Sequence, residues 1–192
     1  MTQRVRAPST TRILRLNKAG MPLSWLTREE AATLVVKGQV VWSLGDQQLE
    51  IRGGFNCLGR QTILLLPTII ATEGNVFRHR EIVPYLCNRM LFRRDQNLCL
   101  YCGRHFSHVD LTRDHIIAKC RGGLDTWTNL VTACRRCNQR KGNESPESAG
   151  MALLAVPFVP NQVEYLALAN RNILADQMVF LKSGFSKNMR AQ

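Results

Sequence analysis

No run of apolar residues in this sequence reaches the roughly 20 that a membrane-spanning helix needs. The longest candidate, residues 63–71, is too short and contains Pro67. The first 18 residues carry five basic side chains and no acidic one, but they lack the apolar block of a secretory signal. The sequence therefore favours a cytoplasmic protein that binds no membrane, with residues 1–10 as a basic flexible arm rather than an organelle transit peptide.

Acidic residues are scarce. The 192 residues include 14 Asp and Glu against 26 Lys and Arg, which gives a formal net charge of +12. The apolar fraction of 45% is ordinary and argues against wholesale disorder. An excess of positive charge is typical of proteins that bind polyanions, and nucleic acid is the commonest polyanion in a cell. Proteins that bind membrane surfaces share this excess, so the charge alone leaves the partner open.

The sequence also lacks an evident disulfide framework, because its seven cysteines are odd in number. In a reducing compartment, paired cysteines more often bind a metal. Two C-x-x-C pairs have the spacing that turns both sulfurs of a pair toward one ion, and they consist of Cys99, Cys102, Cys134 and Cys137. Four thiolates complete a tetrahedral site that suits Zn²⁺ and leave no open position, so the predicted zinc is structural.

Other residues could take part in this site or stand outside it. His105 or His108 could replace one thiol as a ligand, although the four cysteines already fill the coordination shell. Cys57, Cys87 and Cys120 lack the paired spacing, and we interpret them as packing or incidental thiols.

Residues 11–75 predict a small β-rich unit with one helix. Residues 13–16 predict a strand, and Thr27 and Glu30 have the spacing of a capping box that begins a helix ending near Gly38. Between two strand-like segments, residues 39–43 and 48–52, the pair Gly45-Asp46 predicts a hairpin turn.

Residues 144–192 predict a C-terminal helical extension. Ser145-Pro146 is typical of a helix start, and residues 161–183 predict a longer helix with an apolar stripe. Such a stripe is a core face or a docking face for a partner. We expect the residues from Lys187 onward to be frayed.

The segment between the cysteine pairs is longer than a zinc site requires. Thirty-one residues separate Cys102 from Cys134, whereas a plain zinc ribbon typically has about 15 to 20. This insert contains Asp114-His115 before two isoleucines, then Gly122-Gly123 and Asn129, and Asn138 follows the second pair.

The order of these motifs carries a resemblance. Cys-x2-Cys, Asp-His-Ile-Ile, Gly-Gly, Asn-Leu, Cys-x2-Cys-Asn and Lys-Gly-Asn follow one another over residues 97–143. The pattern resembles the HNH endonucleases, and more narrowly the bacterial branch with a cysteine-bound zinc. The resemblance implies an α+β chain with a ββα-metal (His-Me finger) module over residues 76–143, stapled by the zinc. It also implies hydrolysis of DNA phosphodiester bonds to 5′-phosphate and 3′-hydroxyl ends.

The resemblance further implies a role for each motif residue. His115 would be the general base that takes a proton from the attacking water. Asp114 and Asn138 would be oxygen ligands of one catalytic divalent ion, Mg²⁺ or Mn²⁺. Asn129 would hold the loop and orient the His115 ring through the backbone. Asn138 stands where many members of the family have a histidine, which leaves the metal preference open.

Positive charge is concentrated in the same segment. Residues 89–143 hold eleven Lys and Arg against four Asp, a net +7 of the total +12. Charges of this kind position a nucleic-acid duplex through its phosphates without reading its sequence. The predicted substrate-binding residues are Arg121, Arg136, Arg140 and Lys141, although each could equally be a solvated surface charge.

Three other functions compete with a DNA endonuclease. The chain could be a nuclease that acts on RNA, or a non-catalytic zinc module that binds nucleic acid. It could also be an interaction protein that docks through residues 161–183. A homodimer would help a double-strand cut, but nothing in the sequence decides the oligomeric state.

Overall fold

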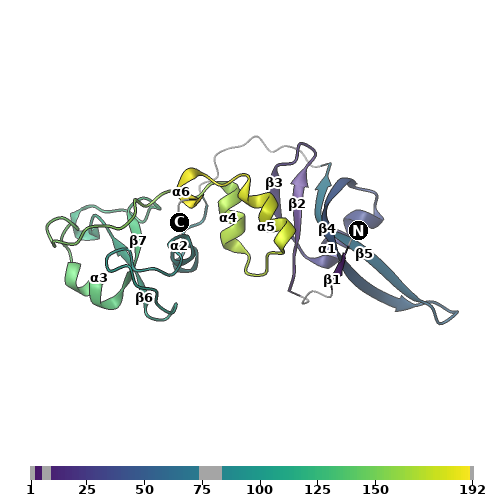
Figure 1. Ribbon diagram of the computed structural model, residues 1–192, viewed down its shortest axis with the longest axis horizontal. Coiled ribbons are helices and arrows are strands. Elements are labelled where there is room, and N and C mark those ends of the chain that lie inside the picture. The colour runs from purple at the N-terminus through teal and green to yellow at the C-terminus, as the bar shows by residue number, and fades with distance from the viewer. Residues whose placement is uncertain (1–2, 6–9, 74–83, 191–192) are drawn as a thin grey trace. The chain divides into compact units, whose positions relative to one another are not determined.

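The computed structural model describes residues 3–5, 10–73 and 84–190, which fold as two compact units (Figure 1). The N-terminal unit consists of residues 1–82 and 162–185, and the ββα unit consists of residues 83–161 and 186–192. Helix and strand are mixed in the α+β manner that the sequence predicts. Within the described ranges, no helix combines the length and the apolar character that crossing a bilayer requires.

A five-stranded sheet forms the centre of the N-terminal unit. Its strands lie in the order β1-β4-β5-β2-β3. They span Gln3–Val5 (β1), Ile13–Asn17 (β2), Pro22–Leu26 (β3), Val40–Phe55 (β4) and Gln61–Thr72 (β5). The β4–β5 and β2–β3 pairs are antiparallel, whereas β2 runs parallel to β5 and β1 runs parallel to β4.

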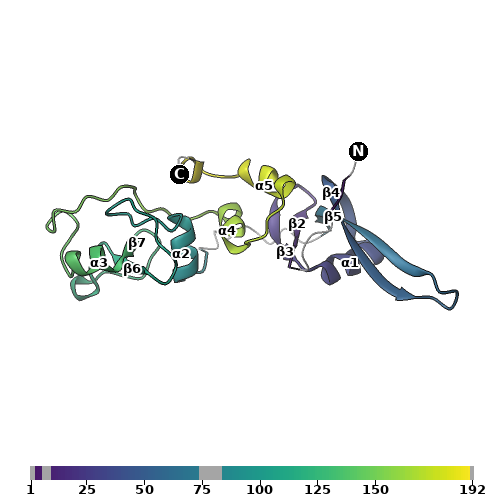
Figure 2. The ribbon, with the colours of Figure 1, turned by 60° about the horizontal axis from the view of Figure 1, so that its bottom comes forward.

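Helices cover both faces of this sheet. Because successive strand residues point to opposite faces, buried Ile13 joins the cluster around α1 (Arg28–Val36), and buried Leu14 joins the cluster around α4 and α5. Helix α4 spans Gln162–Ala169 and α5 spans Ala175–Lys182. Figure 2 shows α1 and the α4–α5 pair on different sides of the strands. The apolar stripe predicted after residue 161 is therefore a core face of this unit.

Predictions that rest on local chemistry are confirmed in this unit. Strand β2 covers the predicted residues 13–16. Thr27 caps α1, its hydroxyl accepting from the Glu30 amide at 3.2 Å while the Glu30 carboxylate accepts from the Thr27 amide at 2.8 Å. Gly38 follows the helix end with a φ of +67°, the left-handed conformation that commonly ends a helix.

The predicted hairpin at Gly45-Asp46 is wrong. Strand β4 runs through these residues as one 16-residue strand, and the pairing with β5 only shifts register between Leu44 and Gln48. Gly45 has a φ of +108°, and a Cβ there would collide with Thr68 and Asp176. The glycine thus serves an irregularity in a long strand, and the chain reverses instead at residues 56–60.

Three other predictions of secondary structure need correction. The helix predicted over 161–183 is broken at residues 170–174, where Asn170 accepts from the Asn172 amide. Ser145-Pro146 begins a series of turns and no α-helix. Residues 187–190 form one helical turn, α6 (Lys187–Arg190), where fraying was expected. In the predicted arm, residues 3–5 form β1, whereas residues 1–2 and 6–9 lie outside the described residues, as does the boundary at residue 75.

The ββα unit contains the predicted hairpin and helix. Strands β6 (Leu111–His115) and β7 (Leu130–Cys134) pair antiparallel, and α3 (Arg135–Lys141) follows β7 directly. A short 3₁₀ helix, η1, spans Lys119–Arg121. Helix α2 (Asn88–Arg94) packs its buried Leu91 and Phe92 against Leu111 and Leu130. These four residues form an apolar core between the helix and the hairpin.

A buried ion pair joins the parts of this unit. Both side chains of Arg94 and Asp95 are almost fully buried, and Arg94 Nε donates to Asp95 Oδ1 at 2.7 Å. Arg94 also donates to the carbonyls of Trp127, Leu130 and Phe158. Asp95 Oδ2 accepts from the Thr132 amide in β7 at 2.8 Å. The pair therefore connects α2, β7 and the chain beyond residue 150.

We predict that Asp95→Ala lowers the free energy of unfolding of the ββα unit by about 3 to 5 kcal/mol, because it leaves a buried guanidinium without its counter-charge. Amide exchange of residues 130–134 would measure the loss.

Asp110→Ala is the matched control, because Asp110 is an exposed carboxylate bonded to Ser107. It should cost about 1 kcal/mol or less. Equal losses in the two variants would contradict a special role for the buried pair.

Candidate active site and metal centre

Four cysteine thiols meet where α3 begins. Their sulfur atoms all lie within 4.8 Å of one another, and they belong to Cys99, Cys102, Cys134 and Cys137. A tetrahedral zinc with Zn–S bonds of about 2.3 Å sets its sulfurs about 3.8 Å apart, so the four thiols lie near enough to one another to bind one such ion. Neither alternative ligand joins them: His105 Nδ1 faces the Gln96 carbonyl, and His108 packs edge-on against Phe92.

The electrostatics of the thiol cluster also suit a cation. Burial is the main cause that raises the pKa of Cys99 and of Cys137 above that of an ordinary thiol. Burial also opposes ionisation of Cys102, but hydrogen bonds from the Arg104 amide and from Cys99 outweigh it and lower the pKa of Cys102 to about 7. Cys99 and Cys137 thus hold their protons until a metal supplies the compensating charge, which is how a thiolate site comes to depend on its ion.

The loop of the first cysteine pair reaches the predicted active site. Tyr101 lies between Cys99 and Cys102, and its hydroxyl donates to Asp114 Oδ2. Burial, followed by this hydrogen bond, raises the pKa of the Tyr101 phenol well above its ordinary value. The phenol thus stays protonated and keeps donating to the carboxylate.

Asp114 is buried and already paired. Besides Tyr101, it contacts the Lys141 ammonium, 3.2 Å from Asp114 Oδ1, and that ammonium also donates to the His115 carbonyl at 2.6 Å. Lys141 was predicted to contact substrate phosphates, but only 2% of this residue is exposed. Its charge neutralises Asp114 inside the unit, so the predicted surface role is not what the structure gives it.

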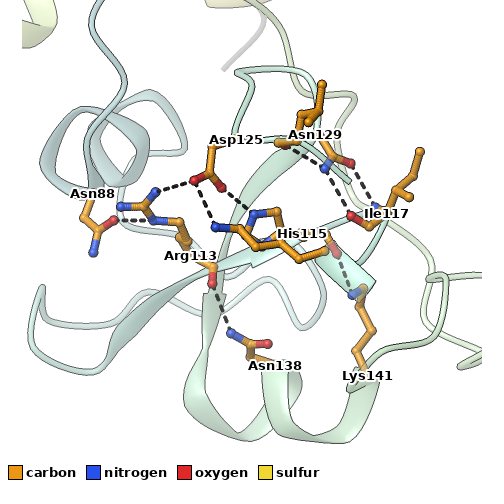
Figure 3. Close-up of polar contacts among 10 residues, drawn as sticks. Asn88, Arg113, His115, Ile117, Asp125, Asn129, Asn138 and Lys141 are labelled. Carbon is orange, nitrogen blue, oxygen red and sulfur yellow. Dashed lines mark hydrogen bonds and ion pairs between the residues drawn. The ribbon is translucent and has the colours of Figure 1, made fainter. Parts of the chain in front are cut away.

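His115 is the last residue of β6, and its side chain leaves the strand on the side opposite to Asp114. Its Nε2 atom lies 2.6 Å from Asp125 Oδ1 (Figure 3). The other oxygen of Asp125 accepts from Lys119 at 3.1 Å. The hydrogen bond with His115, reinforced by Lys119, lowers the pKa of Asp125 below its ordinary value. Asp125 is therefore a carboxylate that faces the ring.

Asn129 holds the chain that follows His115. Its side chain accepts from the Ile117 amide at 2.9 Å and donates to the carbonyls of Ile117 and Leu124. Its backbone carbonyl accepts from the Ile116 amide. Asn129 therefore ties the residues after β6 to the residues before β7.

Asn138 lies on α3 and faces β6. Its amide nitrogen donates to Thr112 Oγ1 at 2.9 Å and to the Arg113 carbonyl at 3.2 Å. This anchoring leaves Asn138 Oδ1 as a free acceptor among the described residues. Lys141, one turn further along α3, reaches Asp114 on the same side of the strand.

The side-chain oxygens of Asp114 and Asn138 are chemically suited to bind a hard cation. A carboxylate has about four acceptor positions, of which Tyr101 and Lys141 occupy two on Asp114. With the free oxygen of Asn138, the unit offers two oxygen ligands, few enough for Mg²⁺, which keeps several of its waters.

The other predicted substrate-binding residues lie on the surface. Arg121, Arg136 and Arg140 are exposed.

Gly123 follows Arg121 by two residues, and a Cβ on it would overlap the Ile117 carbonyl. The tight turn at residues 122–123 therefore fixes where the loop carrying Asp125 begins.

Two side chains that contact candidate site residues are not among the predicted ones. Tyr101 contacts Asp114, and Asp125 contacts His115. The position of Tyr101 inside a C-x-x-C pair was a signal, since that loop must lie against the hairpin. For Asp125 we find no signal in the sequence beyond its place after Gly122-Gly123.

The comparisons with known proteins agree with the geometry. Residues 99–154 match the sequence profile of the HNH endonuclease family. A stretch of 52 residues is 40% identical to the CRISPR-associated endonuclease Cas9 of Corynebacterium diphtheriae. This stretch covers 27% of the present chain and 5% of that protein. The residues that match the family profile lie within the ββα unit.

We predict that the purified chain contains about one zinc ion and that stripping it with a chelator unfolds the ββα unit. Amide protection in β7 should disappear, while protection in β2 and β5 should persist because their core contains no thiol cluster. Metal analysis and amide exchange would measure both effects.

Cys99→Ser should reproduce the loss without any chelator. Cys57→Ser is the matched control, because the Cys57 thiol is exposed in the turn between β4 and β5. A Cys99→Ser protein with full zinc content and unchanged protection would contradict this assignment.

Proposed function

We propose that the protein is a metal-dependent endonuclease that hydrolyses phosphodiester bonds in DNA, because residues 99–154 match the sequence profile of the HNH endonuclease family. The thiol cluster would hold a structural zinc. The observation that carries the proposal is His115 at the end of β6, with its Nε2 bound to a carboxylate and 17% of its side chain exposed. A base must reach water and must be held in one orientation, and this ring meets both needs.

His115 is the proposed general base. The neutral ring would take a proton from a water molecule, and the water oxygen would then attack the phosphorus atom. Asn129 would keep the ring in place because its side chain holds the backbone at Ile117 and at Leu124.

Asp114 and Asn138 would hold the catalytic Mg²⁺ or Mn²⁺, which when bound would stabilise negative charge on the phosphate and on the leaving oxygen. Tyr101 would fix the carboxylate of Asp114 by donating to Oδ2. The bonds of Asn138 to Thr112 and Arg113 would restrain the side chain as a ligand.

One observation favours a second candidate, a non-catalytic module that binds nucleic acid. The Lys141 ammonium already neutralises Asp114, and only 4% of Asp114 is exposed. In such a module, Asp114 and Lys141 would form a structural ion pair, and Asp114 would bind no metal. The exposed arginines would serve such a module equally well, so cleavage itself must discriminate between the candidates.

We predict that the protein cuts plasmid DNA with Mg²⁺ or Mn²⁺ and not with EDTA. His115→Ala should lower the cleavage rate by about 10²-fold or more, because the proposed base is lost, while DNA affinity is retained. Gel analysis of the plasmid would give the rate, and fluorescence anisotropy would give the affinity.

His105→Ala is the matched control, since His105 faces the Gln96 carbonyl and lies on the surface. It should cut like the parent protein. Binding without any metal-dependent cutting by the parent would favour the non-catalytic module, and cutting of RNA alone would shift the substrate.

We predict that Arg140→Ala weakens DNA binding to a similar degree across sequences. It should reduce the slope of log affinity against log salt by about 1, because one phosphate contact is lost. Titrations over a range of salt would measure the slope. Lys182→Ala, an exposed lysine of α5 in the N-terminal unit, should leave the slope unchanged, and equal effects of the two variants would contradict a specific role for Arg140.

A further inference from the structure

His115 has a carboxylate partner that the motif does not supply. Asp125 Oδ1 lies 2.6 Å from His115 Nε2. Asp125 comes from the loop between η1 and β7, ten residues after the histidine (Figure 3). A contact this short between a ring nitrogen and a carboxylate oxygen is a charge-assisted hydrogen bond.

The chemistry of the two groups fixes the direction of this bond. An ionised carboxylate can only accept, so the nitrogen facing it must donate. His115 Nε2 therefore carries the proton, and in the neutral ring the lone pair lies on Nδ1. The nitrogen that can accept a proton is the one turned away from Asp125.

The carboxylate is itself held from several elements. Lys119 of η1 donates to Asp125 Oδ2 at 3.1 Å, and the Arg113 guanidinium of β6 lies 3.9 Å from the same oxygen. Arg113 in turn donates to Asn88 of α2 at 2.7 Å. Two cations and an anchored loop keep Asp125 ionised and limit its rotation.

Asn129 completes the support on the backbone side. It donates to the carbonyl of Leu124, directly before Asp125, and it accepts from the Ile117 amide, two residues after His115. The same side chain thus sets the spacing between the carboxylate and the ring. His115 is thus a histidine oriented by a carboxylate, and the loop between η1 and β7 supplies that carboxylate.

We propose that Asp125 is a positioning residue for cleavage: it accepts Nε2–H of His115 and thereby makes Nδ1 the atom that takes the proton from water. This inference rests on the proposed function. The water proton passes to Nδ1 and the water oxygen bonds to phosphorus. The bond from phosphorus to the 3′ oxygen breaks with its electron pair on that oxygen, which takes a proton from solvent. Asp125 stabilises the imidazolium that results.

The test compares Asp125→Asn with Asp125→Glu. An asparagine can turn its NH₂ group toward Nε2, so that Nε2 accepts a hydrogen bond and the ring proton moves to Nδ1. Nδ1 then carries a proton and can no longer accept one from water. We expect kcat to fall about 10²-fold or more, with DNA affinity unchanged, and Asp125→Glu to recover part of the loss. Asp110→Asn, the same change at an exposed carboxylate elsewhere in the unit, should leave kcat unchanged.

The second readout is independent of activity. The ¹⁵N chemical shifts of the His115 ring, assigned by comparison with His115→Gln, report which nitrogen carries the proton in the neutral ring. We expect Nε2–H in the parent protein and Nδ1–H, or a mixture, in Asp125→Asn, with zinc content unchanged in both.

The outcomes separate this inference from the proposed function. An unchanged tautomer together with unchanged kcat in Asp125→Asn would overturn it. A rise in kcat would also overturn it, because Asp125 would then slow the proton transfer to His115. If the parent protein cuts nothing, the proposed function fails, whereas the shifts still tell whether Asp125 sets the tautomer.

Discussion

The contact of four thiols is the constraint on which the rest of the ββα unit depends. It joins the loop of residues 99–102 to the end of β7 and the first turn of α3. Cys134 also caps α3, because its sulfur accepts from the Cys137 amide. With α3 fixed in this way, Asn138 and Lys141 must face β6. Because Tyr101 lies inside the clamped loop, the same cluster places a phenol on Asp114.

Buried charge is a feature of the ββα unit. The N-terminal unit has a sheet with a cluster of apolar side chains on each face. The ββα unit also has apolar clusters, and it buries two ion pairs, Arg94 with Asp95 and Lys141 with Asp114. A buried pair adds little net stability, but breaking it leaves an uncompensated charge, so it favours one arrangement over others. That precision suits a site built from side chains.

Much of the fold could be predicted from sequence wherever the cause is local. The capping box at Thr27 and Glu30 and the C-x-x-C pairs have their chemistry within four residues, so they are readable. The Gly45-Asp46 pair is decided by distant residues, Thr68 and Asp176, which local propensity cannot see. The site divides in the same way. The motif predicted His115 and Asn129 by order alone, whereas the burial of Lys141 and the approach of Asp125 follow from the packing of the loops.

The adjacency of Asp114 and His115 has a physical reason under the proposed mechanism. In-line displacement needs the attacking and leaving oxygens on opposite sides of the phosphorus atom. Successive residues of a strand project to opposite sides, and the structure divides these two in that way, with Asp114 toward α3 and His115 toward Asp125. A phosphate reached by both must lie beyond the end of β6, where the strand no longer separates the two sides. His115 is the last residue of β6, which is the position that this geometry requires.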